Sequence, residues 1–287
     1  MSGLPKMADA ARAVDLKNDG NRHFNAGDFT RAEALYSKAL IADPTNPSLY
    51  TNRAMARLRM SLWQGVIEDC TTCLKLTGDN NMKANYYLSQ AHLPLKNHDE
   101  ALQHALKAHE ICVKTGDKSL SAVTAQVLRC KKDRWEDLER KRRRETSSLE
   151  SEVISLLSRE RDELLSDPAT TADDESSRTE IREEWDAKME LLARIFDKAR
   201  EAEEKRRKVP DWAIDDISFN IMVDPVITKS GKSYERASIL EHIRRDPAHA
   251  MDPVTRQPLL VSDLRPNIDL KRACDEFLEE NGWAADW

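Results

Sequence analysis

The chain has 287 residues, of which 40% are hydrophobic and 33% charged with only eight glycines, a composition that suits two or three helix-rich domains. Its net charge of −6 argues against a nucleic-acid-binding surface. No apolar run approaches the length of a membrane span, and the first residues lack the apolar core of a secretory signal, so neither a membrane protein nor a secreted one is expected.

The five cysteines indicate reduced thiols, because an odd number without a secretion signal does not suggest a disulfide framework. A cytoplasmic protein is therefore expected, with the nucleus as a second location to test. Cys70 and Cys73 form a C-x-x-C pair. A redox role is the alternative, but both fall at small-residue positions of the helical repeat described next, which favours a structural role.

From about Arg12 to Lys114 the sequence repeats with a period near 34 residues, the length of a tetratricopeptide repeat (TPR). Three helical pairs fit into residues 12–116, which is about the minimum for a stable stack. Asn46 and Pro47 are predicted to cap and begin a helix. The small and aromatic residues that such a stack needs at its helix contacts are Gly20, Phe29, Ala32, Tyr36, Ala39, Ala54, Val66, Cys70, Cys73, Leu88, Ser89, Ala101 and Ala108.

Polar residues recur on the first helix of each repeat, on the face that TPR stacks turn toward a concave groove. They are Lys17 with Asn21, Asn52 with Arg59, and Lys83 with Tyr87, each pair spaced to share one helix face. Lysine and arginine can neutralise a carboxylate and asparagine amides can orient it. The pattern therefore predicts a groove for an acidic C-terminal peptide, although each residue alone would fit an ordinary solvated helix face.

This set resembles the carboxylate clamp of co-chaperone TPR domains, which bind the C-terminal Glu-Glu-Val-Asp of cytosolic heat-shock chaperones. Arg59 stands where that family more often has a lysine, so the charge is kept while the contact geometry changes. Asp117, just after the third repeat, matches a further clamp position. The resemblance implies that the tails of these chaperones are partners.

Residues 117–209 are rich in charge and nearly free of glycine, and apolar residues three to four apart predict two long helices separated at 167–174. Ser177 and Glu180 are expected to begin the second helix as a capping box. A helical hairpin cannot bury both of its apolar stripes alone, so a homodimer is predicted. The alternative is that the stripes contact the protein's own domains. The basic run 141–144 follows acidic residues on a helix and is interpreted as a solvated face rather than a nuclear-import or nucleic-acid patch.

Residues 210–287 are predicted to form a small α+β domain in which two loops flank a short helix. Val226 and Ile227 are strand-like, Gly231 suits a turn, and residues 233–245 are expected to be helical. Two loops around a helix are the architecture of a RING finger. Each RING zinc needs four Cys or His ligands, however, and this region offers Cys274, His242 and His249 alone, so neither a metal nor another cofactor is expected.

The ordered set Asp224-Pro225, Gly231, Tyr234, Asp252-Pro253 and Pro266-Asn267 resembles the U-box, the metal-free relative of the RING in ubiquitin ligases. With the TPR clamp and charged hairpin before it, the chain resembles the CHIP-type co-chaperone ubiquitin ligases. The resemblance implies that the conjugating enzyme docks on Ile217, Phe219 and Pro253, that Arg256 bridges this enzyme and ubiquitin, and that His242 and Asn267 support the fold.

The family implies a ligase that binds a chaperone and positions a ubiquitin-loaded conjugating enzyme beside a misfolded client, without a covalent intermediate of its own. One departure is the segment 245–250, which is longer than the usual link between helix and second loop. A non-catalytic adaptor with an inactive U-box is the alternative. A ligase with its own nucleophile is disfavoured, because Cys274 lies among apolar residues of a predicted helix.

Overall fold

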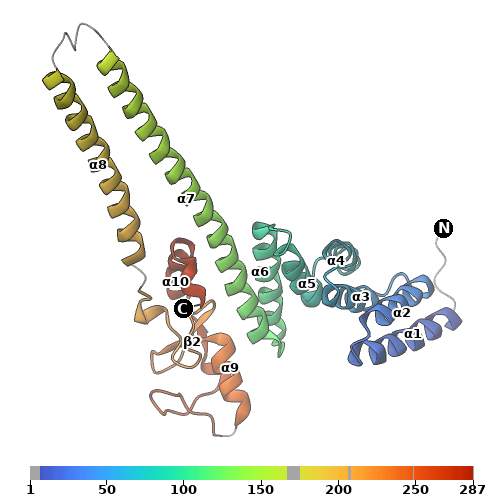
Figure 1. Cartoon of the computed structure of the whole chain (residues 1–287). Coiled ribbons are helices and arrows are strands. Elements are labelled where there is room, and N and C mark those ends of the chain that lie inside the picture. Colours follow the sequence, from blue (N-terminus) through green and yellow to red (C-terminus); the bar gives the residue numbers. More distant parts are fainter. Residues whose placement is uncertain (1–6, 167–174, 206–207, 248, 287) are drawn as a thin grey trace. The chain divides into compact units, whose positions relative to one another are not determined.

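The protein is described by a computed structural model, which places residues 7–166, 175–205, 208–247 and 249–286. Mainly α architecture with one small sheet confirms the predicted fold class (Figure 1). The chain forms two compact units, Met1–Arg134 with Asp211–Trp287, and Trp135–Pro210. No helix among the described residues is both long and apolar enough to cross a membrane.

Six helices stack in antiparallel pairs and form the predicted TPR repeats (Figure 1). They are α1 (Met7–Asn25), α2 (Phe29–Ala42), α3 (Pro47–Arg59), α4 (Trp63–Thr77), α5 (Met82–His92) and α6 (His98–Thr115). Asn46 caps α3 by accepting a hydrogen bond from the Ser48 backbone N–H, and Pro47 occupies the first turn as predicted. Gly78 and Gly116 end α4 and α6 in the left-handed conformation.

The small residues predicted at the helix contacts form the TPR core. Cys70 and Cys73 are fully buried and unpaired, and burial raises the pKa of Cys73 to about 11. The structural interpretation of this C-x-x-C pair is therefore confirmed, because a thiol with a raised pKa carries little thiolate at neutral pH. At Gly20, an added Cβ would lie 2.5 Å from the ring of buried Tyr36. Glycine is required there by the close approach of α1 and α2.

The predicted hairpin consists of α7 (Leu120–Ser166) and α8 (Glu175–Lys205), which run antiparallel (Figure 1). The Ser158 hydroxyl lies 3.4 Å from the Met189 sulfur, and Arg161 pairs with Asp186 at 3.0 Å. The expected start of the second helix at Ser177 is wrong, because α8 already begins at Glu175. The predicted acidic loop, residues 167–174, lies outside the described residues.

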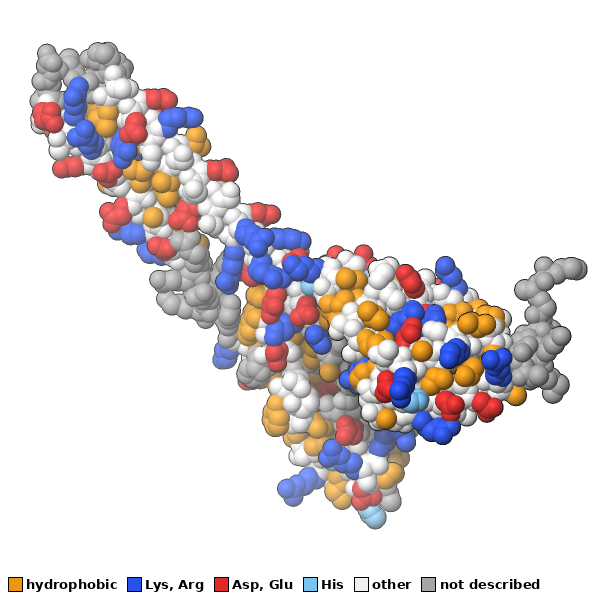
Figure 2. Space-filling view, turned by 45° about the vertical axis from the view of Figure 1, so that its right-hand side comes forward, with side chains coloured by type: hydrophobic (Ala, Val, Ile, Leu, Met, Phe, Trp, Pro, Cys, Tyr) orange, Lys and Arg blue, Asp and Glu red, His pale blue; other side chains and the backbone are white. Residues whose placement is uncertain are grey.

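The first turns of α7 belong to the TPR stack, since Leu120, Val123, Val127 and Cys130 are buried there. Beyond Trp135 the helix belongs to the second unit. The space-filling view shows acidic, basic and apolar side chains interspersed along the hairpin (Figure 2). Such a surface is typical of a long helix whose charges are solvated or paired along its own face.

In the C-terminal domain, a three-stranded antiparallel sheet, ordered β2-β1-β3, packs against the helix α9. Its elements are η1 (Asp211–Ala213), β1 (Pro225–Ile227), β2 (Ser233–Glu235), α9 (Arg236–Arg245), η2 (Val261–Asp263), β3 (Arg265–Pro266), α10 (Ile268–Glu280) and η3 (Gly282–Asp286). The prediction of helix from residue 233 is wrong, because residues 233–235 pair with β1 as a strand. Buried Val226, Tyr234 and Ile239 form the core of this domain.

We predict that Gly20→Ala lowers the free energy of unfolding by about 1–3 kcal/mol, because the new methyl group overlaps the Tyr36 ring. Urea unfolding measures the change. Gly65→Ala is the comparison with a milder contact, since its Cβ would lie 3.0 Å from the Arg57 side chain rather than against an aromatic ring. An unfolding midpoint for Gly20→Ala at or above that of wild type would contradict the tight contact.

Candidate functional site

The predicted TPR groove begins with a pair of asparagines on α1 and α3. The Asn21 Oδ1 accepts hydrogen bonds from the Asn52 Nδ2 at 3.3 Å and from the Tyr36 hydroxyl at 2.8 Å. Tyr36 is fully buried, so this bond anchors the Asn21 side chain to the repeat core. Lys17 lies one turn earlier on α1 and is partly buried. The sequence-predicted asparagines therefore meet across neighbouring repeats.

The other predicted groove residues form two further neighbourhoods. Burial raises the pKa of Tyr87 to about 12, and the nearby Arg59 charge acts in the opposite direction. The pKa of Asp117 is lowered, chiefly by hydrogen bonds from Ser119 and in part by the charge of Lys83. Arg59 thus lies near Tyr87, and Lys83 near Asp117. A cation is present in each neighbourhood, as binding of an acidic peptide requires.

Met55 is a groove residue that the sequence analysis missed. Its sulfur lies 3.1 Å from the Tyr87 hydroxyl and joins α3 to α5. The available signal was its position three residues after Asn52, on the same helix face. A thioether between polar residues offers apolar contact area to a peptide side chain.

A buried ion network holds α3, which carries Asn52, Met55 and Arg59, against its neighbours. Arg53 binds Asp69 through Nε at 2.9 Å, while Arg57 binds both Asp69 at 3.1 Å and Glu33 at 2.8 Å. Asp69 is 2% exposed, and its burial raises its pKa against the pull of the two arginines. Loss of either arginine would leave a buried carboxylate underpaired, which is strongly destabilising.

The two loops of the C-terminal domain share one hydrogen-bond pattern. In the first loop, the Asp215 N–H donates to the Asn220 carbonyl and the Phe219 N–H donates to the Asp215 carbonyl, each at 2.9 Å. In the second, Asp252 makes the equivalent pair of bonds with Gln257 and Arg256 at 2.8 and 2.9 Å. Both carboxylates also accept backbone N–H groups from within their own loop. Each loop is thus closed around one aspartate.

This loop geometry presents two of the four side chains that were predicted to contact partners. Phe219 and Arg256 occupy equivalent positions and have φ angles of 58° and 56°, in the left-handed region that non-glycine residues seldom adopt. Phe219 is 72% exposed, and Pro253 and Arg256 are also exposed. Ile217 is partly buried against the domain core. Strained backbone of this kind clusters at functional sites and costs about 1–3 kcal/mol per residue.

Asp252 is the centre of a hydrogen-bonded group that we call the Asp252 cluster, made with Thr228, Ser230 and Tyr234. Its carboxylate accepts bonds from the Tyr234 hydroxyl at 2.6 Å, Ser230 at 2.8 Å and Thr228 at 3.2 Å. Burial by itself would raise the pKa of Asp252, but these donors and the loop N–H groups hold it below its ordinary value. The cluster ties the second loop to the sheet.

A second group, the Glu235 cluster, ties the first loop to the sheet through Asp215, Asp224, Glu235 and Arg236. Glu235 Oε2 accepts from the backbone N–H groups of Val223 at 2.7 Å and Asp224 at 2.9 Å. Asp215 accepts the Glu235 N–H at 3.0 Å, and Arg236 pairs with Asp224 at 2.5 Å. The Glu235 Oε1 is buried without a partner. Burial raises the pKa of Glu235 to about 7.

The two predicted supporting residues each join separate elements. The His242 Nε2 lies 2.8 Å from the Met251 carbonyl oxygen, so the histidine links α9 to the second loop. Asn267 donates through its backbone N–H to Pro225 and through its side chain to Ser233, and its Oδ1 caps α10. Asn267 therefore holds the sheet and α10 rather than the loops themselves.

Cys274, the alternative nucleophile, is fully buried in α10, and burial raises its pKa to about 12. A thiol in that state is a poor nucleophile at neutral pH. Within the described ranges, no three His, Cys, Asp or Glu side chains are grouped so that they could hold a metal ion.

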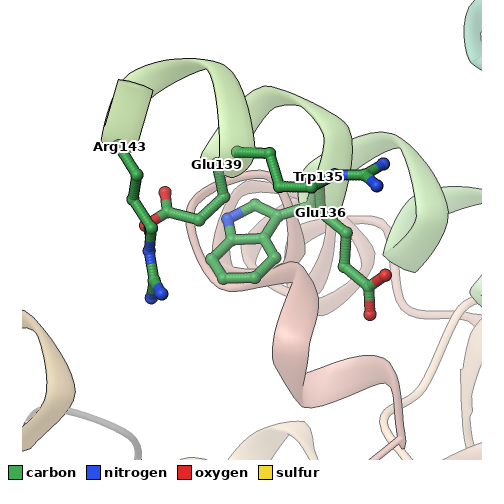
Figure 3. Close-up of a pocket in the computed structure, with 5 residues that line it drawn as sticks. Trp135, Glu136, Glu139 and Arg143 are labelled. Atoms are coloured by element: carbon green, nitrogen blue, oxygen red, sulfur yellow. Dashed lines mark hydrogen bonds and ion pairs between the residues drawn. The ribbon is translucent and has the colours of Figure 1, made fainter. Parts of the chain in front are cut away.

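A hollow of about 230 Å³ on the surface of α7 is lined by Trp135, Glu136, Glu139, Arg140 and Arg143 (Figure 3). The close-up shows Arg143 turned toward Glu139, with which it makes an ion pair of 3.1 Å. In the adjoining basic run, Lys141 pairs with Asp137 at 2.9 Å. These pairs agree with the solvated-face interpretation, because the cations are matched by acids of the same helix.

We predict that Glu235→Gln changes how stability depends on pH. The folded pKa of about 7 lies above the unfolded value near 4.5, so protonation favours the fold and wild type loses stability as pH rises from 4.5 to 7. The loss specific to Glu235 is on the order of 3 kcal/mol. The lowered pKa of Asp252 acts below pH 3.8, outside this window.

Urea unfolding of wild type and Glu235→Gln at pH 5.0 and pH 7.5 measures the effect. The free energy of unfolding of Glu235→Gln, relative to that of wild type, should be higher at pH 7.5 than at pH 5.0. Glu241→Gln, at an exposed carboxylate of α9, is the control. A difference between Glu235→Gln and wild type that stays constant with pH would show that Glu235 is ionised in both states.

Comparison with known proteins finds a family match at the C-terminal domain and a relative that matches nearly the whole chain. The family model described as U-box domain matches residues 209–283. The E3 ubiquitin-protein ligase CHIP of Arabidopsis thaliana is 32% identical over 283 residues, which covers 96% of this chain and 96% of that relative. The E3 ubiquitin-protein ligase PUB24 of the same organism is 42% identical over 80 residues, covering 28% of this chain and 17% of the relative.

Among solved structures, the second TPR of Spaghetti (RPAP3) bound to HSP90 peptide SRMEEVD is 31% identical over 35% of this chain and 93% of its own, with a TM-score of 0.34. The match to the relative from A. thaliana covers nearly the full length of both chains and so includes both the TPR repeats and the U-box of this chain. This chain therefore belongs to the CHIP family of E3 ubiquitin-protein ligases, with TPR repeats followed by a U-box.

Proposed function

We propose that this protein is a co-chaperone ubiquitin ligase. Its TPR groove binds the acidic C-terminal tails of cytosolic heat-shock chaperones, and its U-box recruits a ubiquitin-conjugating enzyme, so that a misfolded client held by the chaperone receives ubiquitin. The observation that carries this proposal is the coexistence of an assembled asparagine pair in the groove with two outward-facing loops on the U-box. Because the proposed partners are cytosolic, a cytoplasmic location is part of the proposal, with the nucleus as a second location to test.

In the groove, the terminal carboxylate of the tail is bound by Lys17 and by amide groups of Asn21 and Asn52. Each charge-assisted hydrogen bond contributes about 1.5–3 kcal/mol. The acidic side chains that precede the terminus meet Arg59 and Lys83 farther along the stack. Met55 and Tyr87, which contact each other, form an apolar surface between these cations.

On the U-box, exposed Phe219 and Pro253 provide, together with half-buried Ile217, the apolar docking surface for the conjugating enzyme. Arg256 follows on the same loop as Pro253 and has five N–H donors, enough to bind carbonyl groups of the enzyme and of ubiquitin together. No nucleophile of this chain takes part. Catalysis consists of holding the ubiquitin thioester in a conformation open to attack by a client lysine.

We predict that Lys17→Ala and Phe219→Ala separate the two activities. Lys17→Ala should weaken an acidic tail peptide at least tenfold and leave autoubiquitination intact, because it removes one charged contact far from the U-box. Phe219→Ala should abolish autoubiquitination and leave peptide affinity unchanged. Isothermal titration calorimetry and an in vitro transfer assay with a panel of conjugating enzymes measure both.

Wild type that binds the tail but transfers no ubiquitin with any conjugating enzyme would indicate an adaptor with an inactive U-box. Loss of transfer in the presence of a chelator would contradict a metal-free U-box. Glu276→Gln controls for changes elsewhere on the U-box surface, because Glu276 is an exposed residue of α10 outside both loops.

We also propose that the hairpin forms a homodimer. Leu149 and Leu156 on α7 and Leu191 and Ile195 on α8 are between 52% and 55% exposed. Apolar side chains at this spacing form stripes that a second hairpin could cover in a four-helix arrangement. Charged residues flank the stripes and would keep the dimer contact specific.

We predict that Leu149→Glu with Leu156→Glu yields a monomer, because the added charges cannot be buried in an apolar contact. Light scattering at micromolar concentration should give twice 32.8 kDa for wild type and 32.8 kDa for the variant. Ser151→Glu with Ser155→Glu adds the same charges at exposed positions of α7 and should remain dimeric. A monomeric wild type would end the proposal.

A further inference from the structure

The U-box contacts the TPR stack through α9. Ala237 and Leu240 of this helix join a core cluster with Ala108, Cys112 and Leu120 from α6 and α7. Cys112 is fully buried in that cluster, and Leu120 is 3% exposed. The outward loops of the U-box take no part in it, since Phe219 is 72% exposed. The contact therefore uses a face of the U-box other than the one proposed for the conjugating enzyme.

Ion pairs flank this apolar contact. Lys131 of α7 pairs with Asp275 of α10, and Lys132 pairs with Asp286 at 2.6 Å. The Lys131 side chain is only 10% exposed, whereas that of Asp275 is 40% exposed, so one side of this pair is shielded from solvent. A partly buried pair is worth more than an exposed one and makes the contact specific.

Arg244, in the last turn of α9, reaches the end of the proposed tail groove. Its Nη2 donates a hydrogen bond of 3.1 Å to the carbonyl of Gly116, the residue that ends α6. Asp117 follows directly, and the charges of both Lys83 and Arg244 act on its carboxylate. A U-box cation thus stands beside two residues of the TPR groove.

A cavity of about 210 Å³ lies at the same junction. Its walls include Leu120 and Ser121 from α7 and Leu240 and Arg244 from α9, with Lys118 beside them. Leucines from both domains line it, and the two cations give it a positive charge. Glu241, which also borders it, is already paired with Arg245 at 3.1 Å. The cavity suits an apolar side chain in an acidic peptide.

The stacking order of the repeats defines which part of a tail would reach this junction. From α1 to α6 each helix contacts the next along the chain, and the groove residues follow from α1 and α3 to α5 and then to Asp117, which comes directly after α6 and the glycine that ends it. A tail whose terminal carboxylate is bound at Asn21 and Asn52 therefore runs past Lys83 toward Asp117. The residues that precede its acidic terminus arrive beside Arg244.

We propose that the U-box completes the chaperone-tail groove. Arg244 donates to a backbone carbonyl or a carboxylate upstream of the acidic terminus, and the cavity between α7 and α9 receives an apolar side chain of the same segment. This inference rests on the proposed tail binding. By linkage, an extended tail and the docked U-box stabilise each other to the same extent.

The test compares two peptides on the full chain by isothermal titration calorimetry. One is Glu-Glu-Val-Asp, and the other is Ser-Gly-Pro-Thr-Ile-Glu-Glu-Val-Asp, which adds an upstream isoleucine. Arg244→Glu should lower the affinity for the longer peptide about tenfold and leave the affinity for the shorter one unchanged. Arg272→Glu, at an exposed cation of α10 that does not line the cavity, is the matched control and should change neither affinity. Unchanged affinity for the longer peptide, or an equal loss for both, would overturn the proposal.

A charge exchange tests whether docking is required. Lys131→Glu and Asp275→Lys should each cause the same selective loss for the longer peptide, because either leaves two like charges facing each other. The double variant should restore wild-type affinity. Single variants with unchanged affinity for the longer peptide would show that Arg244 does not act through a docked U-box.

Lys17→Ala separates the failure of this inference from the failure of tail binding. It should weaken both peptides, because Lys17 belongs to the terminal carboxylate site. If wild type binds neither peptide, tail binding is wrong and the inference falls with it. If wild type binds both and Arg244→Glu leaves the ratio of the two affinities at its wild-type value, the inference alone is wrong.

Discussion

Two buried aspartates closing two loops are the constraint on which the C-terminal domain depends. Asp215 and Asp252 each accept backbone N–H groups of their own loop and side-chain or backbone donors from the sheet. In a RING finger, metal coordination performs this closure. Here a carboxylate with several donors does so, and a buried carboxylate is tolerated only when it is satisfied in this way.

The same closure determines which side chains face outward. Because the chain turns around each aspartate, the fourth residue after it adopts a left-handed conformation, and these residues are Phe219 and Arg256. The strain at each is sustained by the hydrogen bonds beneath it. A surface proposed for protein recognition is therefore built on rigid, satisfied loops, which reduces the entropy lost on binding.

In the TPR repeats, packing in the core orients the residues of the proposed groove. Gly20 lets Tyr36 reach across α1, and the Tyr36 hydroxyl then orients Asn21, which accepts from Asn52. The core packing of Tyr36 thus orients Asn21 and then Asn52 through two successive hydrogen bonds. The buried Arg53–Asp69 pair performs a similar task for α3, so the repeat core holds the groove residues in addition to their contacts with one another.

Local pattern was sufficient for the repeat and its groove. A period near 34 residues and small residues at the helix contacts specify stacked pairs, and spacing of three, four or seven places polar side chains on one face. The sequence pattern gave a wrong prediction where strand pairing outweighs helix propensity. Residues 233–235 continue an apparently helical stretch but form β2, because β1 offers hydrogen-bond partners.

By itself, the sequence determined the order of repeats, hairpin and U-box and the absence of enough Cys and His ligands for a RING, and it suggested most residues of the proposed groove. Only the tertiary structure decided the roles of Glu235 and Asp252 and the position of Arg244. Their partners lie far away in the chain: Val223 is 12 residues from Glu235, Thr228 is 24 from Asp252, and Gly116 is 128 from Arg244. Contacts over such separations depend on how whole elements pack, and no local periodicity records them.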